Sequence, residues 1–181
     1  MAKAQSVPLL LVDGYNVIGA WPDLVQVRDQ AGLELARHQL VETLVNYAAY
    51  KAFTVKLVFD AYAQRTPTTI EPVTQNLDVH YTAFGQTADS YIEAWCARLR
   101  HHPQRTIVVT SDRAQQLTVM GYGAEWMSTQ QLSQDIHILT QQQRQRQQRT
   151  QSHRGTSARF LASGLSADAQ ERLKQLRFGM R

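Results

Sequence analysis

The stretch Val7-Pro8-Leu9-Leu10-Leu11-Val12-Asp13-Gly14-Tyr15-Asn16 is an apolar run that stops at an aspartate and a glycine. An apolar run of this length, with no alternating polar residues, is typical of a strand buried on both faces of a parallel sheet. The same pattern recurs in residues 54–60 and 106–112. We therefore expect three strands that each end in an aspartate, namely Asp13, Asp60 and Asp112.

Helical spacing fills the intervals between these strands. Apolar residues recur every three or four positions from Leu33 to Ala48 and again from Ala88 to Leu99, and a shorter strand is expected at Leu77–Tyr81. Strands that alternate with helices predict an α/β fold with a parallel sheet flanked by helices. In such sheets ligands bind beyond the carboxyl ends of the strands, where the strand order reverses.

A fourth carboxylate, Asp89, is placed differently, because it lies in the first turn of the helix that follows Gly85-Gln86-Thr87. Glu93 lies four residues further on and shares its helix face, so it is a candidate fifth carboxylate or a hydrogen-bond partner of the site. One sheet edge can therefore gather all four aspartates.

Each aspartate alone has a simpler explanation, since Asp commonly caps helices and turns. The set is harder to explain in this way, because two unit charges about 4 Å apart repel by roughly 4 kcal/mol at an effective dielectric near 20. A cation would compensate this repulsion. Oxygen ligands favour Mg²⁺ or Mn²⁺ over zinc, and the six histidines lack the spacing of a zinc site. Metal-assisted phosphodiester hydrolysis is the chemistry that this set predicts.

Other chemistries find no support in the sequence. It contains no Gly-x-Ser-x-Gly elbow and no Gly-x-x-x-x-Gly-Lys phosphate loop, and Gly121-Tyr122-Gly123 is too short for a dinucleotide fingerprint. The lone Cys96 is expected to be a packed helix residue. The chain lacks an apolar stretch of about 18 residues and a signal-like N-terminus, so we expect no membrane association and a cytoplasmic location.

The 181 residues predict one domain with an appendage, and the charge distribution indicates where they divide. Residues 1–139 hold 10 Lys and Arg against 13 Asp and Glu, whereas residues 140–181 hold 9 against 2. We expect a domain over residues 1–140 and a Gln/Arg-rich basic tail over residues 141–181. In the tail, residues 141–149 prolong a helix into a flexible arm, residues 152–157 form a turn or linker, and residues 166–176 form a short helix.

Three motifs together resemble the NYN domain, in its YacP-like bacterial and plastid branch. They are Leu11–Ile18, Gly85–Glu93 and Val108–Arg113, and the resemblance covers roughly residues 7–150. It implies a PIN-like doubly wound parallel sheet and an endoribonuclease that cleaves single-stranded RNA with Mg²⁺ or Mn²⁺. It also implies mRNA as substrate, association with the ribosome, and a bacterial cytosol or plastid stroma.

Carried over by position, the resemblance makes Asp13, Asp89 and Asp112 the metal ligands and Asn16 a polar partner that orients a ligand, water or phosphate. Asp60 matches an acidic position of the site less firmly. The side chains expected around the metal ligands are Glu93 and Ser111. Family members often carry an acidic residue where this chain has Gln86, so the chain departs from the pattern there.

An acidic pocket repels RNA, so basic and aromatic side chains must hold the strand. The candidates for RNA contact are Tyr15, Arg65, Arg113, Arg144, Arg146 and Arg149. A rival hypothesis is a non-catalytic RNA- or ribosome-binding module with a vestigial acidic site. A small-molecule phosphohydrolase is disfavoured, because the paired Asp-x-Asp nucleophile is absent. The oligomeric state stays open.

Overall fold

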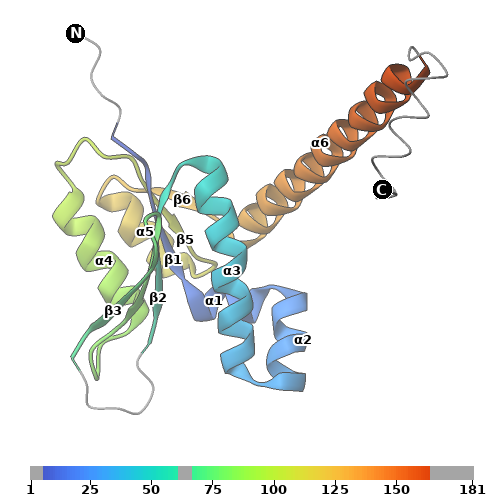
Figure 1. The fold of residues 1–181 in the computed structure, drawn as a ribbon. Helices are drawn as coiled ribbons and strands as arrows, with labels where there is room; N and C mark the ends of the chain where they lie inside the picture. Colours follow the sequence, from blue (N-terminus) through green and yellow to red (C-terminus); the bar gives the residue numbers. More distant parts are fainter. Residues whose placement is uncertain (1–5, 61–66, 164–181) are drawn as a thin grey trace, which may run out of the picture. The chain divides into compact units, whose positions relative to one another are not determined.

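The computed structural model describes residues 6–60 and 67–163 and contains one six-stranded sheet within those ranges (Figure 1). Its strands lie in the order β3-β4-β2-β1-β5-β6. All neighbouring pairs are parallel except β3 and β4. The strands are β1 (Leu9–Asp13), β2 (Thr54–Phe59), β3 (Thr69–Thr74), β4 (Leu77–Tyr81), β5 (Thr106–Val109) and β6 (Glu125–Met127).

Strand β1 lies at the centre of this sheet, and all five of its residues are buried. It pairs in parallel with β2 on one side and with β5 on the other. From β1 the chain adds β2 and β4 on one side, then crosses back to place β5 on the opposite side of β1. The strand order therefore reverses between β1 and β5, and Asp13 ends one of these two strands.

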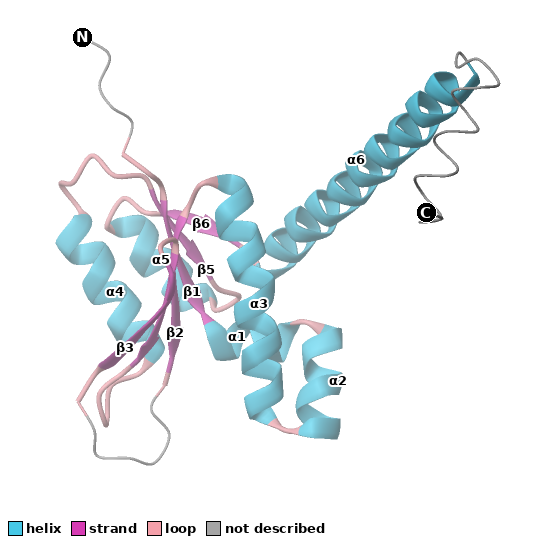
Figure 2. Ribbon diagram, viewed as in Figure 1, coloured by secondary structure: helices cyan, strands magenta, loops and turns pink. Residues whose placement is uncertain are grey.

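Helices cover both faces of the sheet, as Figures 1 and 2 show. α1 and α3 lie on one face, α4 and α5 lie on the other, and α2 packs against α3. These five helices are α1 (Gly14–Ala20), α2 (Pro22–Ala31), α3 (Leu33–Lys51), α4 (Ala88–Leu99) and α5 (Arg113–Gly121). This arrangement confirms the predicted α/β class and the flanking helices.

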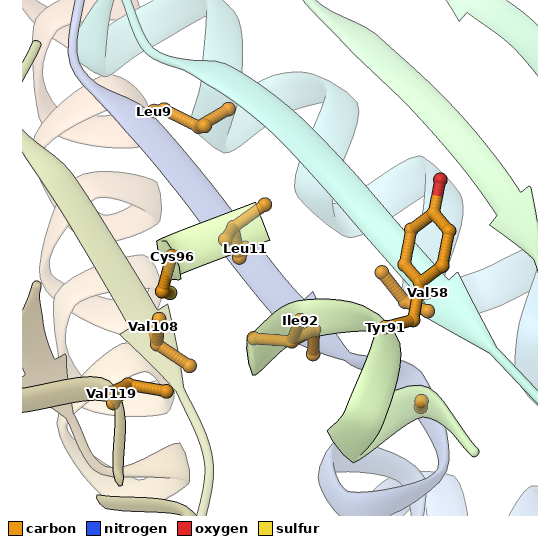
Figure 3. Packing of buried hydrophobic residues seen from close by; sticks show 9 residues of the cluster. Leu9, Leu11, Val58, Tyr91, Ile92, Cys96, Val108 and Val119 are labelled. Carbon is orange, nitrogen blue, oxygen red and sulfur yellow. The ribbon is translucent and has the colours of Figure 1, made fainter. Parts of the chain in front are cut away.

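The core on the α4 side shows why the strands have apolar sequences (Figure 3). Leu11 of β1 and Val108 of β5 pack beneath Ile92 of α4, and all three side chains are completely buried. The adjacent residues of a strand point to the opposite face, so β1 needs apolar residues at successive positions. Burial on both faces explains the uninterrupted run from Leu9 to Val12.

The observed strand ends differ from the predicted ones in two places. β4 and α4 have the predicted bounds, but β2 ends at Phe59 and β5 ends at Val109, so Asp112 stands three residues beyond its strand. The hydroxyl of Thr110 accepts a hydrogen bond from the Asp112 amide at 3.0 Å. Such side-chain bonds to nearby backbone compete with the strand ladder, which explains the early end of β5.

Strands β3 and β6, at the two edges of the sheet, were not predicted. β3 pairs antiparallel with β4, all six of its residues are exposed, and it contains Pro72, with a shift of register between Pro72 and Thr74. β6 has three residues and pairs in parallel with β5. Neither strand has the buried apolar run by which the central strands are recognised.

The last described element is α6 (Thr129–Ser163). The chain divides into two compact units, Met1–His137 and Ile138–Arg181, and α6 begins in the first and continues in the second. The turn or linker predicted at residues 152–157 is wrong, because helix continues through this stretch. A single glycine, Gly155, costs about 1 kcal/mol relative to alanine, and the neighbouring Gln and Arg residues are good helix formers. The helix predicted at 166–176 lies outside the described residues.

No helix in the described part of the chain is both long enough and apolar enough to cross a membrane.

One glycine at the start of α1 is required by packing. A Cβ on Gly14 would lie 2.2 Å from the Phe59 ring, whereas a Cβ on Gly19 of the same helix would meet nothing within 4 Å. We predict that Gly14→Ala lowers the free energy of unfolding by about 1–3 kcal/mol, because the ring must move. Gly19→Ala should leave it unchanged or raise it by up to about 1 kcal/mol.

Urea unfolding monitored by circular dichroism measures both effects. The Phe59→Leu background provides the control, because a smaller side chain should reduce the cost of Gly14→Ala. Equal costs in the two backgrounds would contradict the packing explanation.

Candidate functional site

Asp13 ends β1 and at the same time caps α1. Its Oδ1 atom accepts a hydrogen bond from the Asn16 amide at 3.0 Å, and the residue is only 8% exposed. A carboxylate at a helix N-terminus is stabilised by the backbone amides there. Burial opposes this stabilisation of the charged form, because a buried carboxylate loses its hydration.

Across the point where the strand order reverses, Asp112 caps α5 in a similar way. Its Oδ1 accepts from the Ala114 amide at 2.7 Å and from the Gln115 amide at 3.0 Å. The two loops are joined directly, because Asn16 Oδ1 accepts from the Ser111 amide at 2.9 Å. Asn16 therefore fixes the loop that carries Asp112 to the turn that carries Asp13.

Ser111 connects this loop to a further element. Its hydroxyl lies 2.7 Å from the Thr129 hydroxyl at the start of α6, and the Thr129 carbonyl accepts from the Trp21 indole at 2.9 Å. The predicted role of Ser111 as a supporting residue fits these contacts, although it acts on the loop backbone and on Thr129.

The other two aspartates meet at the N-terminus of α4. Asp60, directly after β2, accepts a hydrogen bond from the Ala88 amide through its Oδ1 atom. Asp89 follows in the first turn of α4, and its carboxyl group lies close enough to that of Asp13 for the two to interact. Two carboxyl groups can share a hydrogen bond only if one of them carries a proton.

This crowding changes the acidity of the pair. Burial raises the pKa of Asp13 from 3.8 to about 6, and the charges of Asp89 and Asp60 add to the effect against the opposing Asn16 hydrogen bond. Burial, followed by the charge of Asp112, also raises the pKa of Asp89. Asp60 and Asp89 therefore act on Asp13, and Asp60 and Asp112 act on Asp89, so negative charge accumulates around this pair.

The residues fit a hard divalent cation in chemistry but do not form a complete cage. Among the described residues, no group of three or more Asp, Glu, His or Cys side chains is arranged so that it could hold a metal ion as it stands. Asp13 and Asp89 converge, while Asp60 and Asp112 each hold a backbone amide through Oδ1. Mg²⁺ commonly binds through one or two carboxylates and keeps several waters. Two converging carboxylates therefore suit such an ion.

Glu93 and the predicted RNA-contacting arginines are among the remaining predicted site residues. Among the described residues, Glu93 forms no hydrogen bond or ion pair with the aspartates, and its charge acts on the buried Cys96 thiol. Arg113 is exposed at the first position of α5. Arg144 and Arg146 are exposed on α6, whereas Arg65 and the Arg149 side chain lie outside the described residues.

Tyr15 is half-buried beside Asp13, and its ring lies 5.0 Å from that of Phe59. Arg37 of α3 approaches both residues, with its Nη1 atom 3.5 Å from the Tyr15 hydroxyl. We did not anticipate this arginine. Its place next to Ala36, on the buried face of α3, was a weak signal that it is partly buried.

Comparisons with known proteins agree with this fold. The family model described as the YacP-like NYN domain matches residues 10–178. The YacP protein of Bacillus subtilis (strain 168) is 33% identical over 133 residues, which are 72% of this chain and 76% of that protein.

Two crystal structures of Bacillus subtilis Rae1 (YacP) are also similar. One of them, of a mutant form, has a TM-score of 0.67 and 31% identity over 80% of this chain and 83% of that one. The second structure has a TM-score of 0.67 and 27% identity over 96% of both chains.

The raised pKa of Asp13 predicts an unusual stability effect. In the folded chain Asp13 titrates near 6 and in the unfolded chain near 3.8, so the stabilisation from its protonation is present below pH 3.8 and lost as the pH rises through 6. Without divalent metal at neutral pH, Asp13→Asn should therefore raise the free energy of unfolding, on the order of 2 kcal/mol. The gain should vanish near pH 4.

Urea unfolding in EDTA at both pH values measures this difference, with the exposed Asp29→Asn as the control that should change little. The comparison must be between variants, because burial lowers the pKa of His80 to about 4 and that group titrates in the same range. If Asp13→Asn destabilised the protein at neutral pH, the Asp13 carboxylate would not be the repelled and desolvated charge that its raised pKa indicates. Millimolar Mg²⁺ should stabilise the wild type more than the variant.

Proposed function

The chain belongs to the YacP-like NYN domain family, a PIN-like nuclease family, and from this premise we propose that it is a metal-dependent endoribonuclease that cleaves single-stranded RNA. Family membership supports a nuclease or RNA-related role. The observation that carries the finer proposal is the convergence of Asp13 and Asp89, with raised pKa values, at the reversal of strand order. A buried carboxylate with a second, partly buried one beside it is unfavourable in the charged state, and a bound cation would remove this repulsion.

Asp13 and Asp89 would hold Mg²⁺ or Mn²⁺, with Asp112 as a third ligand through the carboxylate oxygen that does not cap α5. When bound, such an ion would supply Lewis-acid activation of water and would neutralise charge on the phosphate. Asn16 positions the Asp112 loop through the Ser111 amide, and Asp60 positions α4 through the Ala88 amide. Both residues therefore set the separation of the metal ligands.

The substrate proposed is mRNA, with the ribosome as a partner that presents it. Support comes from the basic part of α6, where Arg144 and Arg146 are exposed on a helix that has no acidic residue from 141 to 163. Arginine side chains at this density attract phosphates without reading sequence. We assign α6 the role of electrostatic attachment to RNA.

A second candidate function is a non-catalytic RNA- or ribosome-binding module. One observation favours it: Asp13, Asp60 and Asp112 each stabilise a local backbone turn or helix start, so their presence has a structural explanation. The close approach of Asp13 and Asp89 has no such explanation. This difference makes the enzyme the better supported proposal.

Cleavage of an mRNA in a purified translation system with Mg²⁺ tests whether the chain is an endoribonuclease. We expect the wild type to cut the RNA, and both Asp13→Asn and Asp89→Asn to lower the rate by at least about a hundredfold, because each removes a metal ligand. Asp29→Asn should cut normally. Since Asp13→Asn is predicted to be more stable than the wild type, a loss of cleavage would not reflect unfolding.

The same RNA without ribosomes shows whether translation is needed to present it. An intact RNA with every variant, accompanied by undiminished binding, would favour the binding module.

The attachment role of α6 is tested in the full chain by replacing Arg144, Arg146 and Arg149 with Gln, which keeps the helix propensity. We expect weaker RNA binding, and a slope of log K against log salt reduced by up to about 2, because each phosphate contact to a single strand contributes about 0.7. The stabilisation by Mg²⁺ should not change. An unaltered salt slope would exclude these arginines from binding.

A further inference from the structure

Arg37 lies on the second turn of α3, and its side chain is only 24% exposed. Its guanidinium carbon lies 5.9 Å from the centre of the Phe59 ring, and its Nη1 atom lies 3.5 Å from the Tyr15 hydroxyl. Phe59 directly precedes Asp60, and Tyr15 follows Asp13 by two residues. The cation is therefore adjacent to two of the strand ends that carry the acidic site.

The hydrogen-bonding capacity of this arginine is poorly used. A guanidinium has five donors. Nη2 is paired with Glu34, Nη1 makes a contact at the outer limit of a hydrogen bond, and the buried Nε atom has no partner among the described residues. A buried donor without a partner is unfavourable, and native structures usually avoid it. This incomplete use of its donors makes the guanidinium a candidate site for an anion such as phosphate.

Glu34 already occupies the position of such an anion. Its side chain is 83% exposed, whereas that of Arg37 is mostly covered, so the carboxylate contacts the cation from the solvent side. Glu34 is thus the exposed partner of this ion pair, and an exposed side chain can exchange for another anion. A phosphate presents the same geometry to the guanidinium as a carboxylate, with two parallel hydrogen bonds.

Aromatic rings beside Arg37 complete a surface suited to a nucleic-acid strand. Phe59 is fully buried and supports the rings of Tyr15 and Tyr81, which are half-buried and lie 5.0 and 6.0 Å from it. Burial and the charge of Glu71 raise the pKa of Tyr81, and the charge of Arg37 opposes this shift, so Arg37 acts on this ring too. Aromatic faces next to a cation bind bases and backbone together.

We propose that Arg37 binds a phosphate of the single-stranded RNA beside the acidic site and that Glu34 occupies this position when RNA is absent. The proposal rests on the function proposed above and adds the contact that offsets repulsion between the RNA and the aspartates. Pairing with Glu34 neutralises Arg37 in the free protein, and a phosphate of the RNA takes the place of Glu34 in the complex. A strand that displaces Glu34 gains a desolvated cation, which binds phosphate more strongly than an exposed one.

The test measures binding of a fluorescently labelled single-stranded RNA to the full chain carrying Asp89→Asn, which prevents cleavage. Arg37→Gln should lower the affinity about tenfold and reduce the slope of log K against log salt by about 0.7. The matched control is Arg105→Gln, because Arg105 is also paired with a glutamate, Glu125 at 2.7 Å, but directly precedes β5 and so lies at the amino ends of the strands, away from the aspartates. It should alter neither quantity.

Glu34→Gln distinguishes exchange from a structural ion pair, because it should raise the RNA affinity by removing the competitor. Arg37→Lys should bind RNA more weakly but keep the slope of log K against log salt. Lysine keeps the positive charge but lacks the two parallel N–H donors of the guanidinium. Circular dichroism verifies that each variant is folded. Equal behaviour of Arg37→Gln and Arg105→Gln, a loss of affinity in Glu34→Gln, or no RNA binding by the Asp89→Asn parent would overturn the proposal.

Cleavage by the wild-type chain is scored separately from binding. If the wild type never cuts RNA, the nuclease proposal fails while the binding comparison still decides the role of Arg37. If the wild type cuts and Arg37→Gln binds as Arg105→Gln does, the Arg37 proposal alone fails.

Discussion

The parallel pairing of β1 between β2 and β5 is the constraint on which the rest of the molecule depends. It places five successive residues in the interior and directs the last of them, Asp13, to the edge where the strand order reverses. Asn16 binds the loop before α5 to this edge, and the first turn of α4 brings Asp89 next to Asp13. A carboxylate in this position cannot be fully hydrated. The raised pKa of Asp13 is thus a consequence of the way the sheet is built.

Capping and ligand binding are often treated as competing explanations for an aspartate at a helix start. Here one carboxylate can serve both purposes, because Oδ1 of Asp13, Asp60 and Asp112 holds backbone amides while each side chain has a second oxygen. Capping also limits the rotation of the side chain, so it prepares the second oxygen for a ligand. The structural role of these residues thereby supports the functional one.

Much of the fold could be predicted from the sequence, because buried parallel strands and amphipathic helices have strong periodic patterns. The bounds of β4 and α4 followed from such patterns, as did the gathering of the aspartates at one edge. Arg37 could not be found in this way, since its contacts with Tyr15 and Phe59 join distant segments and no local pattern encodes them. The continuous helix through Gly155 was missed for a different reason: the turn preference of a short stretch was outweighed by its neighbours.

The exposed edge strand β3 has a consequence for the behaviour of the molecule in a crowded solution. An edge strand offers unpaired amides and carbonyls to any other strand, and this is a common origin of aggregation. Pro72 removes one donor from β3, and the register shift beside it disturbs the regular spacing that an incoming strand would need. The opposite edge, β6, has only three residues. Growth of the sheet into a neighbouring molecule is therefore discouraged at both ends, which helps the chain to remain dispersed at high concentration.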